Sequence, residues 1–304
     1  MSREGILQEE YKALAERGYE AVKLLGKGAF SRVILVREKP ERTSFSMTAL
    51  SGKKQSLLNV GTYRREQSQV PVRYLACKIC GQETLGLREG ELLQRISHPL
   101  FPLFFGMWQK DGKVFLLMEA VCGSSLAAIL SRRGAFTERQ TARMGLELAA
   151  GLKVLHELPK PMLFRDVKPA NILIRQDGRV KLLDLGCACS LGTTPGNLAG
   201  TPDFGAPEQL ESGHVLTAAC DVYGLGRTLQ AAAGDRCGKA FARVLQACTE
   251  PNTGKRIPDM RGVMAALVDF SKESGKGKLP QRRSFLSPQI ICVKNIWESS
   301  YKNT

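Results

Sequence analysis

The sequence lacks any apolar run that approaches the roughly 20 residues needed for a helix to span a bilayer. Residues 1–18 mix acids with bases and contain no apolar core, so we expect no secretory signal. The nine cysteines follow no regular framework spacing, which predicts free thiols in a reducing compartment. These absences predict a cytoplasmic protein with no membrane span and no disulfide scaffold.

Aromatic residues are also scarce, at 7% of the chain, although the formal net charge is +15. Much of that charge lies in residues 39–73 and 271–304, each of which holds seven Lys/Arg against two Glu. A dedicated nucleic-acid surface interleaves aromatic with basic side chains, and these two segments do not. We therefore expect solvated charge runs that could attract an acidic partner, and no nucleic-acid site.

The remaining composition is that of an ordinary globular protein, with 43% hydrophobic and 24% charged residues over 304 positions. That length is sufficient for one large domain or for two lobes. Residues 6–17 have the apolar spacing of a helix. The apolar runs that follow predict four strands, at residues 19–25, 32–36, 73–80 and 113–118.

Between the second and third strands, residues 39–72 are polar and basic without a sustained period, which predicts a long loop. Later in the chain, apolar periodicity predicts helices at residues 124–130 and 137–158. A further core helix is expected over residues 238–248. The sequence therefore changes from predicted strands in its first part to predicted helices in its second.

Four polar residues share an otherwise apolar stretch between Leu163 and Gly186: Asp166, Lys168, Asn171 and Asp184. Residues 171–174 and 179–183 read as two short strands around a turn at 176–178. Such a hairpin would hold the two aspartates near one another. Two carboxylates and an amide that converge on one point can bind a divalent metal ion and orient a hydroxyl group.

Residues 164–171, FRDVKPAN, and the triplet 184–186, DLG, resemble the catalytic and metal-binding loops of the eukaryotic-type (Hanks-type) serine/threonine protein kinases. The run at residues 200–208, GTPDFGAPE, resembles the end of their activation segment. The motifs come in the order of the family, and the resemblance covers residues 19–268 apart from 39–72.

The resemblance implies an α+β, two-lobed protein kinase fold. A small antiparallel β-sheet lobe with one helix would extend to about residue 118, and a mainly helical lobe would begin at about residue 123. Residues 1–18 would be an N-terminal helical extension, and residues 269–304 a basic C-terminal tail. Only 34 residues separate Asp221 from Arg256. The lobe is therefore shortened after its central helix, at the place where the family has a peptide-docking helix.

The resemblance also assigns roles in the transfer of the γ-phosphoryl group of ATP. Asp166 would accept the proton of the attacking hydroxyl, and Lys168 would steady the γ-phosphate. Asn171 and Asp184 would hold Mg²⁺. Thr201 would bond near Asp166 and Lys168, and Glu208 would pair with Arg256 far down the chain.

Lys78 would reach the α- and β-phosphates of ATP with a glutamate as its partner. Glu89 lies on the inward helical stripe with Leu92, Leu93 and Ile96, whereas Glu91 falls off that stripe, so Glu89 is the expected partner. The other residues expected to bind the nucleotide are Gly26, Gly28, Val33, Ala76, Met118, Glu119 and Val121.

The implied function is an ATP- and Mg²⁺-dependent serine/threonine kinase that acts on a protein hydroxyl and on itself, with Thr193 and Thr194 as candidate phosphorylation sites. Lys168 followed by Pro169 is the form of serine/threonine-directed members. Two alternatives share the fold: a pseudokinase-like scaffold and a small-molecule phosphotransferase. A third alternative differs in class: metal or redox sensing by Cys77, Cys80, Cys187 and Cys189. On a strand, however, Cys77 and Cys80 point to opposite faces.

Overall fold

The computed structural model describes residues 6–28, 30–39, 73–195 and 200–273. They form two compact units, one from the residues up to 90 together with 103–120, and the other from 91–102 together with the residues from 121 on. Most of the predicted basic loop at 39–72 and basic tail at 269–304 lies outside the described residues.

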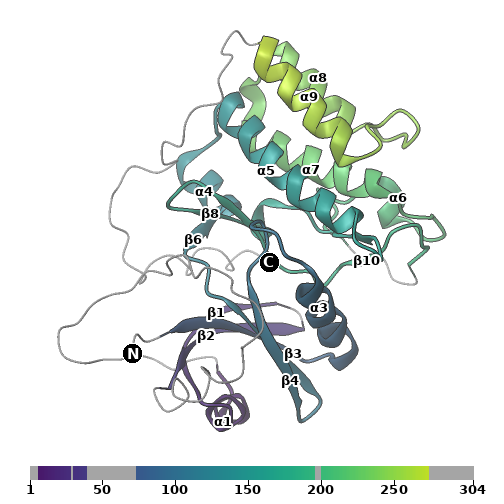
Figure 1. The fold of residues 1–304 in the computed structure, drawn as a ribbon. Helices are drawn as coiled ribbons and strands as arrows, with labels where there is room; N and C mark the ends of the chain where they lie inside the picture. Colours follow the sequence, from purple (N-terminus) through teal and green to yellow (C-terminus); the bar gives the residue numbers. More distant parts are fainter. Residues whose placement is uncertain (1–5, 29, 40–72, 196–199, 274–304) are drawn as a thin grey trace. The chain divides into compact units, whose positions relative to one another are not determined.

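The first unit is built on a five-stranded antiparallel sheet with the order β1-β2-β3-β5-β4 (Figure 1). Its strands are β1 (Tyr19–Lys27), β2 (Ser31–Glu38), β3 (Tyr74–Cys80), β4 (Phe104–Lys110) and β5 (Lys113–Glu119). The four predicted strands are thus confirmed, and β4 was not predicted. A register shift between Phe104 and Gly106 interrupts the alternation of β4, which explains why its pattern is weak.

The first unit also contains helix α1 (Gln8–Glu16) and the part of α3 (Glu83–Arg95) up to Gly90. Leu14 of α1 packs in one buried cluster with alternate residues of the strands, among them Cys77 and Phe115, so α1 covers that face of the sheet. In α3, a Cβ on Gly90 would lie 2.9 Å from Leu116, whose side chain points to the other face. The two helices therefore lie on opposite faces of the sheet.

The second unit is mainly helical. Its helices are α4 (Leu126–Arg133), α5 (Glu138–His156), α6 (Pro207–Leu210), α7 (Ala218–Ala233), α8 (Lys239–Cys248) and α9 (Met260–Glu273), with 3-10 turns η1 (Pro169–Asn171) and η2 (Gly234–Arg236). Three short strands pair in the order β6-β8-β9, namely β6 (Gly123–Ser125), β8 (Ile172–Arg175) and β9 (Val180–Leu182). A separate pair joins β7 (Met162–Leu163) to β10 (Cys189–Ser190).

The predicted helix at 124–130 begins too early, because residues 123–125 form strand β6. Gly123 lies so close to β8 that a Cβ would sit 2.7 Å from the carbonyl oxygen of Ile174. Ser125 then ends the strand and caps α4, since its Oγ accepts the N–H of Ala128 at 3.1 Å. The predicted helices at 137–158 and 238–248 are confirmed as α5 and α8.

Helices α5, α7 and α9 form the core of the second unit and lie side by side (Figure 1). Leu148, Leu152 and Leu155 make one fully buried stripe on α5. Gly145 of α5 lets Leu229 of α7 and Leu267 of α9 approach, because a Cβ there would lie 2.9 Å from each. Within the described part of the chain, no helix is both long and apolar enough to cross a membrane.

We predict that Gly151→Ala on α5 lowers the free energy of unfolding, although alanine is the better helix former by about 1 kcal/mol. A Cβ at this position would lie 2.1 to 2.9 Å from three side-chain atoms of Leu100. Overpacking of that kind costs about 1–3 kcal/mol and should outweigh the gain in propensity. Chemical denaturation measures the difference. Ala150→Gly serves as the control for propensity alone, and a stabilised Gly151→Ala variant would contradict the expectation.

Candidate active site

The predicted hairpin in the central stretch is present as strands β8 and β9. Ile172 pairs with Leu182 and Ile174 with Val180, in antiparallel register. Beyond the paired strands, the N–H of Leu183 donates to the carbonyl oxygen of Asn171 at 2.8 Å. The hairpin therefore places Asn171 directly beside the residue that precedes Asp184.

Asp166 is the centre of a hydrogen-bonded cluster in the second unit. Its Oδ1 accepts the hydroxyl of Thr201 at 3.0 Å, and its Oδ2 accepts the amide of Asn171 at 2.9 Å. The Nζ of Lys168 lies 3.0 Å from the same Oδ2 and donates to the Thr201 hydroxyl oxygen at 2.8 Å. Donors from three residues therefore orient one carboxylate.

Asp184 is exposed and has a backbone φ of +69°, and Arg165 also has a φ of +69°. Left-handed backbone is unusual for residues other than glycine, costs about 1–3 kcal/mol and persists mainly where surrounding bonds enforce it. At Asp184 the side chain contributes, because its Oδ1 accepts the N–H of Gly186 at 3.0 Å. Arg165 directly precedes Asp166, and Asp184 lies between Asn171 and Thr201 in the sequence.

Asn171 and Asp184 fit the requirements of Mg²⁺. The amide nitrogen of Asn171 donates to both the carbonyl oxygen and the carboxylate of Asp166 at 2.9 Å, so Oδ1 is the atom that it would present to a cation. The described residues contain no cluster of three or more His, Cys, Asp or Glu that could hold a metal ion. Two oxygen donors suit a Mg²⁺ that completes its shell with water and phosphate oxygens.

Helix α7 holds the backbone of the loop that carries Asp166. Asp221, which is 1% exposed, accepts the N–H of Phe164 and the N–H of Arg165, each at 2.8 Å. Its Oδ2 also lies 2.8 Å from Nε2 of His156, at the end of α5. One buried carboxylate thus joins the two longest helices of the unit to the loop.

Three polar side chains that support the same loop were not predicted: His156, Gln209 and Thr228. Thr228 donates to the carbonyl oxygen of Val167 at 3.0 Å, and Gln209 donates to that of Arg165 at 2.6 Å. Thr228 follows Asp221 by seven residues and so shares its helical face, a signal that could have revealed it. His156 and Gln209 have no comparable local signal.

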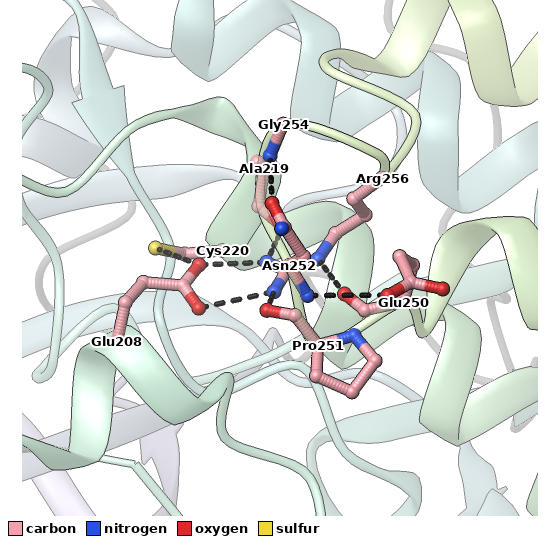
Figure 2. A network of polar contacts seen from close by, with 8 residues as sticks. All are labelled: Glu208, Ala219, Cys220, Glu250, Pro251, Asn252, Gly254 and Arg256. Atoms are coloured by element: carbon pink, nitrogen blue, oxygen red, sulfur yellow. Dashed lines mark hydrogen bonds and ion pairs between the residues drawn. The ribbon is translucent and has the colours of Figure 1, made fainter.

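A buried ion pair joins Glu208 to Arg256 (Figure 2). The two guanidinium nitrogens donate to the two carboxylate oxygens at 2.6 and 3.0 Å, and the thiol of Cys220 donates to Glu208 at 3.3 Å. The guanidinium also donates to the carbonyl oxygens of Ala219, Glu250 and Pro251. Burial would raise the pKa of Glu208, but its hydrogen bonds to Arg256 and the charge of that residue hold the pKa below the usual 4.5.

In the first unit, Lys78 and Glu89 form a second buried ion pair. They are 5% and 4% exposed, and Nζ of Lys78 donates to the carboxylate oxygens of Glu89 at 2.6 and 2.8 Å. Val33 is the partner of Lys78 across β2 and β3, and Ala76 is the partner of Met118 across β3 and β5. Alternation therefore puts Val33, Ala76 and Met118 on the face of Lys78, opposite the face that α1 covers.

The glycine-rich turn connects β1 to β2. Gly26 is paired with Val33 at the end of β1, and the N–H of Gly28 donates to the carbonyl oxygen of Ser31 at 2.8 Å. Farther along, the N–H of Glu119 donates to the carbonyl oxygen of Leu103 at 2.8 Å. Val121 is buried and belongs to the second unit.

The four cysteines considered for metal or redox sensing divide between the two units. Cys77 and Cys80 are buried in β3, and burial raises the pKa of Cys77 far above its usual value. In the second unit, burial and the charges of Asp166 and Asp184 raise the pKa of Cys187 to about 11. Because thiolates are the reactive and metal-binding form, protonated thiols of this kind do not favour a sensor.

Loss of the ion pair between Glu208 and Arg256 should be costly. We predict that Arg256→Met lowers the free energy of unfolding by about 3–5 kcal/mol, because it leaves Glu208, whose side chain is only 11% exposed, without its partner. The control is Lys272→Met, which removes an exposed pair with Asp269 and should change stability by less than about 1 kcal/mol. Chemical denaturation of both variants gives the comparison.

The same ion pair predicts that the free energy of unfolding depends on pH. The pKa of Glu208 is lower in the folded chain than its usual value of 4.5, so its stabilisation is complete above pH 4.5 and is lost as the pH falls through the folded value. As the pH falls below 4.5, the Arg256→Met variant should therefore lose less of its free energy of unfolding than the unsubstituted chain. An identical pH profile for both would contradict the assignment.

Comparison with known proteins places these features in a family. The family profile described as Protein kinase domain matches residues 19–236. The human protein PRKY is 33% identical over 196 residues, covering 64% of this chain and 62% of the relative. The human cAMP-dependent protein kinase catalytic subunit PRKX is 30% identical over 209 residues, with coverages of 68% and 52%.

The RAC-beta serine/threonine-protein kinase A of Xenopus laevis is 32% identical over 220 residues, covering 68% of this chain and 38% of the relative. The chain therefore spans between 38% and 62% of the length of these three relatives. The matched segment ends before helix α8 and begins after helix α1. Because the profile covers more than half of the chain, the protein belongs to the Hanks-type serine/threonine protein kinase family and has its two-lobed fold, with a small antiparallel sheet lobe and a mainly helical lobe.

Proposed function

We propose that the protein is an ATP-dependent serine/threonine protein kinase, which transfers the γ-phosphoryl group of Mg-ATP to protein hydroxyls, its own included. The observation that carries the proposal is the cluster of Asp166, Lys168 and Thr201, in which one carboxylate is oriented by a lysine and a hydroxyl at 3.0 Å. Phosphoryl transfer needs mainly positioned groups and neutralised charge, and this cluster supplies both.

Each residue of the cluster has a definite task in the proposal. Asp166 accepts the proton of the attacking hydroxyl through a carboxylate oxygen. Lys168 is held 2.8 Å from the Thr201 hydroxyl, which keeps its ammonium beside Asp166, where it can meet the γ-phosphate. Asn171 and Asp184 would hold Mg²⁺, which when bound would neutralise phosphate charge.

Nucleotide binding is proposed mainly for residues of the sheet unit, with Val121 from the second unit. Lys78 is buried, so its ammonium would be costly without an anionic partner, and its ion pair with Glu89 would hold it in place for the α- and β-phosphates. Gly26 and Gly28 would bring backbone N–H groups near the phosphates. Val33, Ala76 and Met118 would contact adenine, and backbone groups of Glu119 and Val121 would hydrogen-bond to it.

Specificity for serine and threonine is proposed from the pairing of Lys168 with Thr201 and from Pro169, which follows the lysine. The relatives PRKX and RAC-beta carry kinase names, and the latter is named a serine/threonine-protein kinase.

Phosphorylation of Thr193 and Thr194 belongs to the same proposal. The hydroxyl of Thr193 already donates to the carbonyl oxygen of Ser190 at 2.7 Å, so its modification would break that bond.

One observation favours a small-molecule acceptor as a second candidate. Helix α7 ends at Ala233 and α8 begins at Lys239, with only the 3-10 turn of residues 234–236 and two further residues between them. No docking helix stands in that described segment, so a protein substrate would have to be held elsewhere. The basic loop at residues 39–72 or the basic tail at residues 269–304 could hold such a substrate by attracting its acidic residues.

A cytoplasmic location is proposed as well. Eight cysteines of the described residues are free thiols, several of them buried, which suits a reducing compartment.

Labelled ATP should give phosphoryl transfer to the protein itself and to a generic protein acceptor. We predict that Asp166→Asn lowers the transfer rate by about a thousandfold, because the general base is lost. Lys78→Met should abolish transfer by weakening nucleotide binding. Asp269→Asn and Lys272→Met, which alter an exposed pair on α9, should leave the rate unchanged.

Other outcomes would separate the candidates. ATP binding without any phosphoryl transfer would support the alternative of a pseudokinase-like scaffold. Transfer to small alcohols but not to proteins would support a small-molecule phosphotransferase. Equal rates for Asp166→Asn and the unsubstituted chain would remove Asp166 from its role.

A further inference from the structure

Helix α1 precedes the segment that matches the family, which begins at residue 19. It nevertheless packs tightly against the sheet of the first unit, with Ala13 and Leu14 buried in the cluster that contains Ile34 and Cys77. Among these apolar contacts lies one buried acid, Glu10, which is 3% exposed.

The carboxylate of Glu10 is bound at both of its oxygens. Oε2 accepts the N–H of Leu7, at the start of the helix, at 3.0 Å. Oε1 accepts Nη1 of Arg32, on β2, at 3.0 Å. A buried carboxylate is costly unless it is paired and hydrogen-bonded, so the position of Glu10 and that of Arg32 depend on each other.

Arg32 lies at the base of the glycine-rich turn. It pairs with Lys27 of β1 and with Ile79 of β3, so three strands meet at this point. On the turn side, Gly28 donates to the carbonyl oxygen of Ser31 at 2.8 Å, and Gly81 donates to that of Phe30 at 2.9 Å. A displacement of Arg32 would therefore move the residues that carry the turn.

We propose that Glu10 is a positioning residue for nucleotide binding, which acts through Arg32 to hold the base of the glycine-rich turn. The inference rests on the proposed function, since it gives the turn the task of binding the phosphates of ATP. Backbone N–H groups bind phosphate well only when their directions are set beforehand, and Glu10 supplies that restraint from outside the family-matched segment.

Two other acids of α1 provide matched controls. Glu9 pairs with Lys113 and Glu16 pairs with Lys110, at the two ends of the β4–β5 connection and not at the turn. Glu9 is 56% exposed in its side chain, whereas Glu10 is buried. Exposed pairs of this kind contribute little to stability and should not affect the turn.

The test compares Glu10→Gln, Arg32→Gln, Arg32→Lys and Glu9→Gln in the full chain. Amide hydrogen exchange at Gly28 and Gly81, in the absence of nucleotide, reports the turn directly. Loss of one charge-assisted bond predicts exchange about tenfold faster in Glu10→Gln and Arg32→Gln. Arg32→Lys keeps the charge and should recover much of the protection, and Glu9→Gln should match the unsubstituted chain.

The kinetic readout is the KM for ATP, which should rise about tenfold in Glu10→Gln and Arg32→Gln while kcat changes less than about twofold. If Glu10→Gln does not fold, the two Arg32 variants decide the matter, because Arg32 is partly exposed. The proposal is overturned if the Glu10 and Arg32 variants lose stability but keep normal exchange at Gly28. It is also overturned if Glu9→Gln speeds exchange at Gly28 as much as Glu10→Gln does. An unsubstituted chain that fails to bind ATP refutes the proposed function, and the exchange data still decide the positioning role.

Discussion

The second unit depends on one buried carboxylate, that of Asp221. It accepts two backbone N–H groups of the loop at 2.8 Å and lies equally close to His156. Because these donors come from the loop and from α5, the carboxylate joins three segments that are far apart in the sequence. Without it, two N–H groups would be buried without a partner, and the left-handed backbone of Arg165 would lose its support. The orientation of Asp166 follows from this arrangement.

Three further ion pairs have at least one buried member. Lys78 has Glu89, Arg256 has Glu208 together with three carbonyl oxygens, and Glu10 has Arg32 and the N–H of Leu7. Such pairs add little net stability compared with apolar packing, but they are costly to break. They therefore favour one arrangement of the chain over its alternatives, which a site built from positioned charges requires.

Much of the fold was predictable because its signals are local. The hairpin of β8 and β9 follows from a turn between two apolar runs, and the stripe of α5 follows from helical spacing. The errors have physical causes. Ser124 and Ser125 were predicted as helical, but pairing with β8 makes them part of a strand, and the shifted register at Gly106 obscures β4. Ile96 continues the stripe of Glu89 in the sequence, yet α3 ends at Arg95.

The sequence by itself determined the types and the order of the residues proposed to take part in phosphoryl transfer, from Lys78 to Asp184, and the local elements that carry them. These depend on neighbours within a few positions, where spacing and turn chemistry decide the outcome. The tertiary structure alone decided which distant groups complete each site: His156 for Asp221, Gln209 for Arg165 and Glu10 for Arg32. Nothing in a local pattern reveals these partners, because a polar residue within an apolar stripe acquires one only when the elements pack.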